Sequence, residues 1–246
     1  FNCTGCPAVY TTQSNKEPLP WYCLILSNDA NVRIEYQLDR TNNEVNFRIY
    51  TCNFEVDDYI AFGLSGSPSQ TWMVGGDVCV CRFDGDLKAP VCNDHHLSSR
   101  AQCATTGGSY DGACPDTILG GTDDCSKISI YREYGTTIFG FSRKLTGNDM
   151  NDTDIILGTE QYLIWAKGKT FPASTGAANE RWVLRHAPTE RSQASNPIKL
   201  DFNSTNDTCE YRYSCTSSPL SKDPWTIEPV CGNKLPSHGE IRAVIG

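Results

Sequence analysis

Residues 32–38 read Val-Arg-Ile-Glu-Tyr-Gln-Leu, and this alternation of apolar and polar side chains decides the fold class. A period of two is typical of a β-strand that buries one face. Turn-forming residues follow at 39–43, and the alternation resumes at Val45, Phe47 and Ile49, which predicts a hairpin. Regular structure therefore begins with an antiparallel β pair.

Similar strand signals recur along the chain, and no helical period extends over ten residues. Some of the segments are continuously apolar, which predicts central strands, whereas others alternate and predict strands with one exposed face. The further predicted strands are 59–64, 77–83, 127–131, 137–143, 161–166 and 198–202. About eight short strands with turns between them predict an all-β, two-sheet antiparallel β-sandwich in one domain.

The chain divides into three segments by composition. Residues 1–22 form a predicted N-terminal arm stapled by disulfide, residues 23–205 the sandwich, and residues 206–246 a cysteine-containing C-terminal extension. Within the sandwich, residues 84–125 lack sustained periodicity but carry four cysteines, which predicts a disulfide-ordered or functional excursion. Phe1 stands in place of an initiator methionine and indicates a processed or trimmed start, and the strand-like end indicates that the natural chain continues.

Cysteine and glycosylation signals indicate the compartment. Thirteen cysteines accompany four Asn-x-Ser/Thr sequons, at Asn2, Asn151, Asn203 and Asn206. This combination predicts a disulfide-rich glycoprotein of the extracellular space or secretory pathway. The odd cysteine count leaves at least one thiol that is free or bonded to another chain.

Charge and hydropathy exclude two classes of partner. The net charge of -8 argues against a nucleic-acid partner, because binding phosphates requires clustered Lys and Arg. No run approaches the roughly 18 to 20 apolar residues that span a bilayer, so no membrane span is predicted in this chain.

Met73 and His186 are the first candidate site residues. The chain has only two methionines and four histidines, and these two lie beside a predicted strand start and a loop proline. Thioether and imidazole form a known axial pair for haem iron, which then moves electrons because no position is left for oxygen. The alternative is that Met73 fills the core and His186 lies on a surface loop, and spacing alone favours it.

Other chemistry is less well supported. Covalent haem attachment is excluded at Cys3 and Cys6, because Pro7 follows where a histidine is required, so any haem would be of b type. No Ser, His and Asp set forms a recognisable motif, and no hydrolase is predicted. The chain is not expected to be a catalyst by itself.

A copper or zinc site is a second metal hypothesis. His95 and His96 with Cys79 and Cys81 supply imidazole and thiolate ligands of the type that these metals prefer. The favoured alternative is that both cysteines form disulfides or pack on one strand face, and that the paired histidines lie on an exposed loop.

A series of motifs resembles a known family. Ala-Phe-Gly-Leu-Ser-Gly-Ser at 61–67, Met-Val-Gly-Gly-Asp-Val at 73–78, Ile-Trp-Ala-x-Gly at 164–168, His186 and Leu-Asp-Phe at 200–202 follow the order of a DOMON domain. The sequence is most similar to the DOMON domain of Skeletor-type extracellular proteins, although the DM13 domains of those proteins are absent here.

The resemblance implies an immunoglobulin-like sandwich that holds haem b or a sugar in an apolar pocket. Met73 and His186 fall on the two ligand positions of haem-binding members, and the resemblance also implies a Cys103–Cys114 disulfide. Since some DOMON domains bind no haem, the fold alone does not decide the function. The candidate pocket walls, chosen because they flank the ligand segments, are Phe62, Trp72, Ile164 and Trp165.

Three functions follow as hypotheses. The first is a secreted haem b protein that relays single electrons to an unknown redox partner. The second is an extracellular matrix or filament-forming glycoprotein, with or without haem, that self-associates through edge strands, the arm and a spare cysteine. The third is a carbohydrate-binding module that uses Trp and Tyr side chains in the same pocket.

Overall fold

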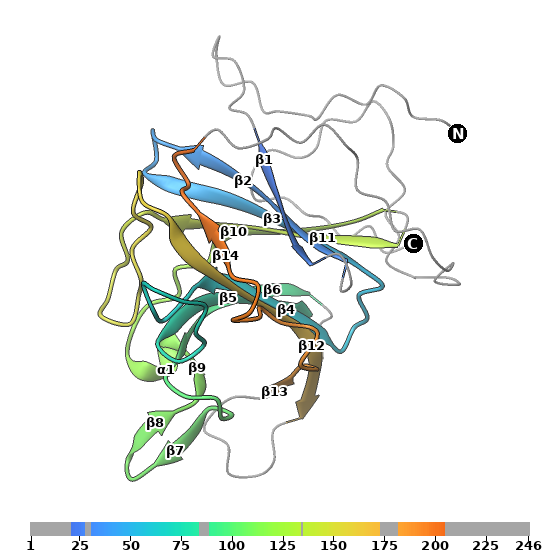
Figure 1. Cartoon of the computed structure of the whole chain (residues 1–246). Coiled ribbons are helices and arrows are strands. Elements are labelled where there is room, and N and C mark those ends of the chain that lie inside the picture. Colours follow the sequence, from blue (N-terminus) through green and yellow to red (C-terminus); the bar gives the residue numbers. More distant parts are fainter. Residues whose placement is uncertain (1–20, 28–30, 84–88, 134, 173–181, 205–246) are drawn as a thin grey trace.

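The computed structural model describes residues 21–27, 31–83, 89–133, 135–172 and 182–204 (Figure 1). The predicted arm up to residue 20 and the predicted extension from 206 lie outside these ranges, as do the sequons at Asn2 and Asn206 and the two cysteines of the arm. The described residues form fourteen strands and one short helix.

Five strands make the first sheet, in the order β1-β2-β3-β11-β10, with every neighbouring pair antiparallel. The hairpin predicted from the alternation is β2–β3, with Val45 opposite Leu38 and Phe47 opposite Tyr36. The strands are β1 (Tyr22–Ser27), β2 (Val32–Asp39), β3 (Glu44–Cys52), β10 (Ser126–Glu133) and β11 (Thr136–Lys144).

Seven strands make the second sheet, in the order β13-β12-β4-β5-β6-β9, with β14 also paired to β12. Its named strand pairs are antiparallel too. The strands are β4 (Asp58–Leu64), β5 (Gly76–Phe83), β6 (Pro90–Leu97), β9 (Ala113–Pro115), β12 (Gln161–Pro172), β13 (Trp182–Arg185) and β14 (Ile198–Leu200). The predicted two-sheet, all-β sandwich is confirmed.

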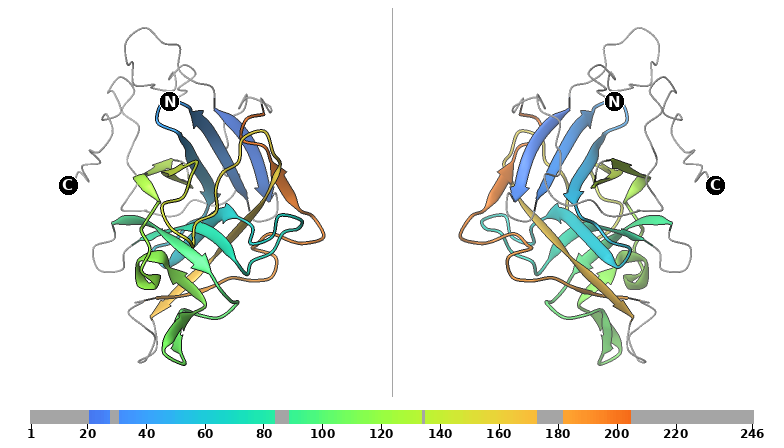
Figure 2. Two further views of the ribbon diagram at one scale, coloured as in Figure 1. Left: turned by 90° about the vertical axis from the view of Figure 1, so that its left-hand side faces the viewer. Right: turned by 90° about the vertical axis from the view of Figure 1, so that its right-hand side faces the viewer.

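The remaining elements are small and lie at one end of the sandwich. β7 (Ala104–Thr106) and β8 (Ser109–Asp111) form a separate two-stranded hairpin, which projects away from the sheets in both views of Figure 2. The helix α1 (Asp116–Leu119) has four residues. No helix in the described ranges has both the length and the apolar character that a bilayer crossing requires.

Aromatic side chains fill the space between the two sheets. The ring centroid of Phe47 on β3 lies 5.5 Å from that of Phe62 on β4 and 5.2 Å from that of Phe141 on β11. Phe202, just after β14, meets the Phe47 ring edge-on at 5.8 Å. Such tilted and edge-on pairs are favourable beyond the apolar area that they bury. We call the side of the seven-stranded sheet that contacts this core the inner face.

Disulfides link the parts of the sandwich. Cys79 on β5 is bonded to Cys125, directly before β10, and so joins the two sheets. Cys81–Cys92 joins β5 to β6, and Cys103–Cys114 closes the region before α1. Cys23 and Cys52 are disulfide-bonded as well, so none of the cysteines in the described ranges is free. Disulfides of this kind are typical of proteins in an oxidising compartment.

The structure confirms one part of the favoured alternative to a copper or zinc site, the disulfides of Cys79 and Cys81, and corrects the other, the exposed loop for the histidines. Cys79 and Cys81 are oxidised, so their sulfurs are not thiolate ligands for copper or zinc. His95 and His96 do not lie on a loop but on strand β6, and His95 is only 2% exposed. Its Nδ1 lies 3.0 Å from the Asn93 carbonyl oxygen.

Candidate functional site

A second apolar cluster covers the side of the seven-stranded sheet that faces away from the core, which we call the outer face. Along β4, β5 and β12, every second residue contributes to it, because successive side chains of a strand point to opposite faces. Its buried members are Tyr59, Ala61, Val78, Val80, Leu97 and Ile164, and its partly buried members are Met73, Ala113, Ala166 and Leu184.

Met73 joins the outer face from the loop between β4 and β5. The hydroxyl of Ser65 organises this loop, because it accepts a hydrogen bond from the Trp72 amide at 2.8 Å and donates one to the Gln70 carbonyl at 2.7 Å. The amide of Gly76 donates to the Met73 carbonyl at 2.8 Å. A Cβ at Gly76 would lie 2.7 Å from that carbonyl oxygen, so only glycine permits this approach.

His186 lies beside the edge of the same sheet. Leu184, the third residue of β13, belongs to the outer cluster, and β13 ends at Arg185, so His186 is the first residue after the strand. β13 runs beside β12, with Leu184 opposite Thr170. A Cβ at Gly168 would lie 2.8 Å from the His186 Cα, so a glycine is again required beneath the candidate ligand.

The histidine ring has one nitrogen engaged by the backbone. Nδ1 of His186 lies 3.2 Å from the Ala187 carbonyl oxygen. A carbonyl can only accept a hydrogen bond, so Nδ1 carries the proton and Nε2 carries the lone pair. Metal-bound histidines are commonly oriented in this way, with the nitrogen opposite the metal donating to a carbonyl.

The four predicted wall residues do not lie on one face. Ile164 belongs to the outer cluster with Met73, whereas Phe62 and Trp165 pack into the core between the sheets. Trp72 is 40% exposed, and the Arg100 guanidinium lies 4.8 Å above its ring. The structure therefore brings Met73 and Ile164 to one face, and it places the His186 backbone close to Gly168 of β12.

Several residues of the outer face were not singled out from the sequence. Tyr59, Ala61 and Ala166 belong to it, and they share their strand parity with Ile164 or pair with residues that do. Ala61 lies opposite Ala166, for instance. The alternation of side chains along β12 indicates which of its residues share a face with Ile164. Adding the residues of β4 to that face requires the register between β4 and β12, which the sequence does not give.

Comparison with known families gives the identity of the fold. A family model described as DOMON domain matches residues 28–168. The chain belongs to the DOMON family. The resemblance noted in the sequence is thereby confirmed, and the matched segment contains Met73 and ends before His186.

Curated relatives of this DOMON domain are longer proteins. Protein Skeletor, isoforms B/C, of Drosophila melanogaster is 30% identical over 115 residues, which is 46% of this chain and 14% of that protein. Isoforms D/E of the same protein are 30% identical over 115 residues, or 7% of their length. The chain thus aligns with only a small part of each relative.

Two solved structures share part of the backbone arrangement. The cytochrome b domain of pyranose dehydrogenase from Coprinopsis cinerea has a TM-score of 0.46 and 13% identity, covering 75% of this chain and 83% of that one. The cytochrome domain of Myriococcum thermophilum cellobiose dehydrogenase has a TM-score of 0.43 and 10% identity, covering 74% and 84%.

The outer face of this DOMON domain fits the requirements of haem b on three observations. The Met73 thioether packs on the outer face and the His186 backbone lies close to Gly168 of β12, and thioether and imidazole form a known ligand pair for haem iron. The proton position on His186 leaves Nε2 available. The side chains of Ala61, Ala113 and Ala166 are short and project little from the sheet, which suits a planar ring.

A carboxylate lies near one member of the outer face, Tyr59. Tyr59 is 3% exposed, and burial, with a further contribution from the Glu190 carboxylate, raises the pKa of its phenol above the ordinary value. Glu190 closes the short loop after His186, because its amide donates to the Ala187 carbonyl at 3.0 Å. Tyr59 therefore stays neutral at physiological pH and adds no charge to the face.

Two sequons fall within the described ranges. Asn203 is exposed directly after β14, and its side-chain oxygen accepts a hydrogen bond from Arg40. Asn151 is half-buried, and its backbone carbonyl accepts a hydrogen bond from His96 Nδ1 at 3.1 Å. Asn203 is the more accessible of the two as a glycan acceptor.

Proposed function

We propose that this DOMON domain is an extracellular haem b protein that relays single electrons, with Met73 and His186 as the axial ligands. Two observations support the proposal: Met73 packs on the outer face, and the backbone of His186, 113 positions later in the sequence, lies close to Gly168 of β12. The redox partner is a further protein or domain, which this proposal leaves open.

The roles of the chain's own residues follow from their contacts. The Ala187 carbonyl holds the proton on His186 Nδ1 and so orients Nε2 as the donor atom. Ser65 fixes the loop that carries Met73. The aliphatic outer face excludes water, which strengthens electrostatic interactions at the site. When bound, haem b would supply a one-electron iron couple with both axial positions filled by protein.

A visible spectrum of the native or haem-reconstituted protein tests the proposal. We expect a Soret band, and sharp α and β bands on reduction. His186→Ala should abolish stable haem binding, and Met73→Leu should lower the reduction potential and remove the low-spin spectrum. Met150→Leu is the matched control, because the only other methionine is 95% exposed. A colourless protein after reconstitution, or equal effects of both methionine substitutions, would refute the proposal.

A second candidate function is assembly into an extracellular matrix or filament. β1 is an edge strand of the five-stranded sheet, and Ile25 on it is 59% exposed. Exposed apolar edge strands favour pairing between chains. Sedimentation and non-reducing gels should then show multimers, and Ile25→Lys should reduce them. Monomers at all concentrations would exclude this function.

Carbohydrate binding at the same face is the remaining alternative. Sugar affinity that survives Met73→Leu would support it, because a sugar does not need the thioether. Glycan-array screening of the haem-free protein is the direct measurement. Absence of binding to every glycan would exclude the carbohydrate-binding function.

A further inference from the structure

A dense group of aspartates lies around Arg143. It forms two triads of carboxylate oxygens, and within each triad the oxygens lie within 4.8 Å of one another. The first triad is Asp77, Asp94 and Asp152, and the second is Asp116, Asp149 and Asp152. Both triads contain Asp152, so a positive charge beside one triad also changes the electrostatic potential at the other.

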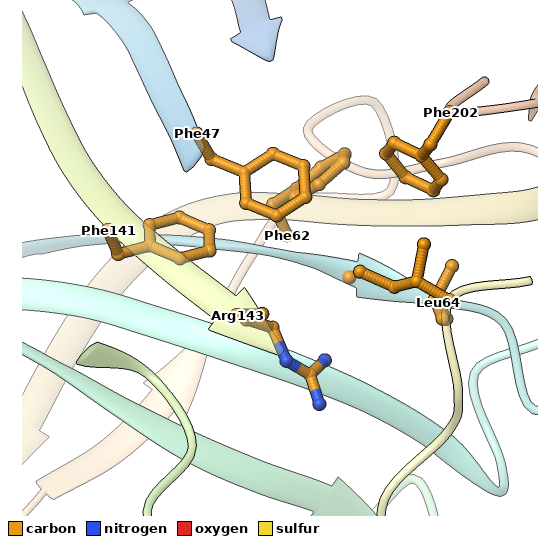
Figure 3. A pocket seen from close by; sticks show the side chains of 8 residues that line it. Phe47, Phe62, Leu64, Phe141, Arg143 and Phe202 are labelled. Atoms are coloured by element: carbon orange, nitrogen blue, oxygen red, sulfur yellow. The ribbon is translucent and has the colours of Figure 1, made fainter. Parts of the chain in front are cut away.

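Arg143 neutralises the first triad. Its Nη2 lies 2.7 Å from Asp77 Oδ2, 3.6 Å from Asp94 Oδ2 and 3.9 Å from Asp152 Oδ1. Figure 3 shows its guanidinium turned away from the phenylalanine rings that line the small pocket beside it. The arginine therefore occupies the position that a metal ion would take between these three carboxylates.

The second triad has no such cation. Within the described residues, no ion pair reaches Asp116 or Asp149, and Asp152 has only the long contact to Arg143. Asp116 is 1% exposed, and neither of its carboxylate oxygens accepts a hydrogen bond of good geometry in this part of the chain. Asp149 and Asp152 are partly buried and accept backbone hydrogen bonds, from Thr122 and Asn148 respectively, both at 2.7 Å. Burying a carboxylate without a partner is costly, so a positive ligand is expected beside Asp116.

A neighbouring aspartate shows what a satisfied carboxylate looks like in this region. Asp124 accepts hydrogen bonds from Asn148 Nδ2 at 2.7 Å, Thr122 Oγ1 at 3.1 Å and the Asn148 amide at 3.2 Å. Although burial acts to raise the pKa of Asp124, the hydrogen bonds from Asn148 and Thr122 lower it. Burial, and then the charges of Asp77, Asp149 and Asp152, raise the pKa of Asp116 to about 7.

The loop that supplies Asp149 and Asp152 is anchored in place. Thr153 donates its amide to Asp77 Oδ2 at 2.6 Å, in addition to the bond between His96 and the Asn151 carbonyl. A Cβ at Gly121 would lie 2.3 Å from Asp149 Oδ2, so this glycine makes room for the carboxylate. The second triad is thus held in position before any ligand binds.

We propose that Asp116, Asp149 and Asp152 bind a calcium ion. Ca²⁺ takes six to eight oxygen ligands at about 2.3–2.6 Å, so two oxygens on one ion lie at most about 5 Å apart. The 4.8 Å limit within the triad meets this condition. Water completes the shell, and the irregular ligand set suits Ca²⁺ better than Mg²⁺, which requires near-ideal octahedral geometry. The site is independent of haem.

Calorimetry and thermal unfolding of the full chain, first stripped with a chelator, test the site with CaCl₂ as the only added ligand. We expect binding with a Kd of roughly 0.1–1 mM, as in extracellular calcium modules, and a rise in Tm at millimolar Ca²⁺. Absence of both effects in the unmodified chain, or tighter binding of Mg²⁺ than of Ca²⁺, would overturn the assignment.

Substitutions locate the ion. Asp116→Asn should weaken Ca²⁺ binding by at least about tenfold and should raise the Tm of the calcium-free protein, since it removes an uncompensated buried charge. Gly121→Ala should weaken binding with all charges retained. The matched control is Asp57→Asn, in an exposed acidic cluster where Lys169 Nζ already lies 3.0 Å from Asp57 Oδ1 and 2.8 Å from Asp58 Oδ1. Unchanged affinity in Asp116→Asn, or an equal loss in Asp57→Asn, contradicts the proposal.

Discussion

The two faces of the seven-stranded sheet are built from the same strands but from different kinds of residue. Adjacent residues of β12 show the contrast, because Trp165 packs into the inner aromatic core and Ile164 packs beside Met73 on the outer face. The inner face carries large rings and the disulfide sulfurs of β5. The outer face carries mostly aliphatic residues, one tyrosine, Tyr59, and the candidate ligand Met73.

This difference separates stability from ligand binding. Interlocking rings and covalent links on the inner face hold the two sheets together. The outer face includes three alanines, at positions 61, 113 and 166. Substitutions on the inner face should therefore change mainly the free energy of unfolding, whereas substitutions on the outer face should change mainly haem affinity.

Phe62→Ala should have the largest effect on stability. The side chain is 2% exposed and contacts Phe47 across the sandwich. Loss of a buried phenylalanine costs about 3–5 kcal/mol, because it combines lost burial with a cavity. Chemical denaturation followed by fluorescence measures the change. A loss below about 1 kcal/mol would mean that the inner face is not the main source of stability.

Removal of the Cys79–Cys125 disulfide by paired Ala substitutions should come next, with a loss of about 2–4 kcal/mol. The equivalent Cys103–Cys114 variant should lose about 1 kcal/mol less, because its sequence separation is 11 against 46 and a shorter loop restrains the unfolded chain less. Denaturation of both variants under identical conditions gives the comparison. The reverse order would show that native contacts, and not chain entropy, dominate.

Ala166→Leu should change stability by no more than about 1 kcal/mol, since the site is partly buried. It should nevertheless weaken haem binding strongly, because the larger side chain occupies the outer face, on which Met73 also packs. Haem titration followed at the Soret band measures the loss. Unchanged haem affinity in Ala166→Leu would show that haem does not bind on the outer face.

Trp72→Ala should have the smallest effect. The ring is 40% exposed and makes its main contact with Arg100. Surface substitutions of this kind change the free energy of unfolding by about 0.5 kcal/mol or less. Haem titration of Trp72→Ala decides whether the ring belongs to the binding surface, and an unchanged affinity is expected.

The sequence predicted most of the sheet strands but missed others for an identifiable reason. The hairpin β2–β3 and strands β4, β5 and β11 were predicted within about two residues, because their apolar periodicity is clear. β6 was missed, since its inward position 94 carries an aspartate that is buried beside Arg143, 49 positions away in the sequence. β1 was missed because its first residue, Tyr22, was assigned to the arm.

Less of the two candidate sites could be predicted from the sequence. Motif order identified Met73 and His186, but which side of β12 faces Met73 depends on a register that no local pattern encodes. Phe62 and Trp165 were therefore grouped with Ile164 although they point to the other face. The calcium triad joins Asp116 to a loop more than 30 positions later, and in the sequence these aspartates resemble ordinary turn residues.

The bond between Cys79 and Cys125 has a mechanical consequence. If the domain is pulled from its ends, the 46 positions between these cysteines cannot be drawn out while the bond is intact. The Cys81–Cys92 and Cys103–Cys114 bonds lie inside this loop and each keep 11 positions closed. At about 3.5 Å per extended residue, reduction of the Cys79–Cys125 bond alone therefore lengthens the stretched chain by roughly 80 Å. The redox state of a single bond thus sets how far this domain extends under load.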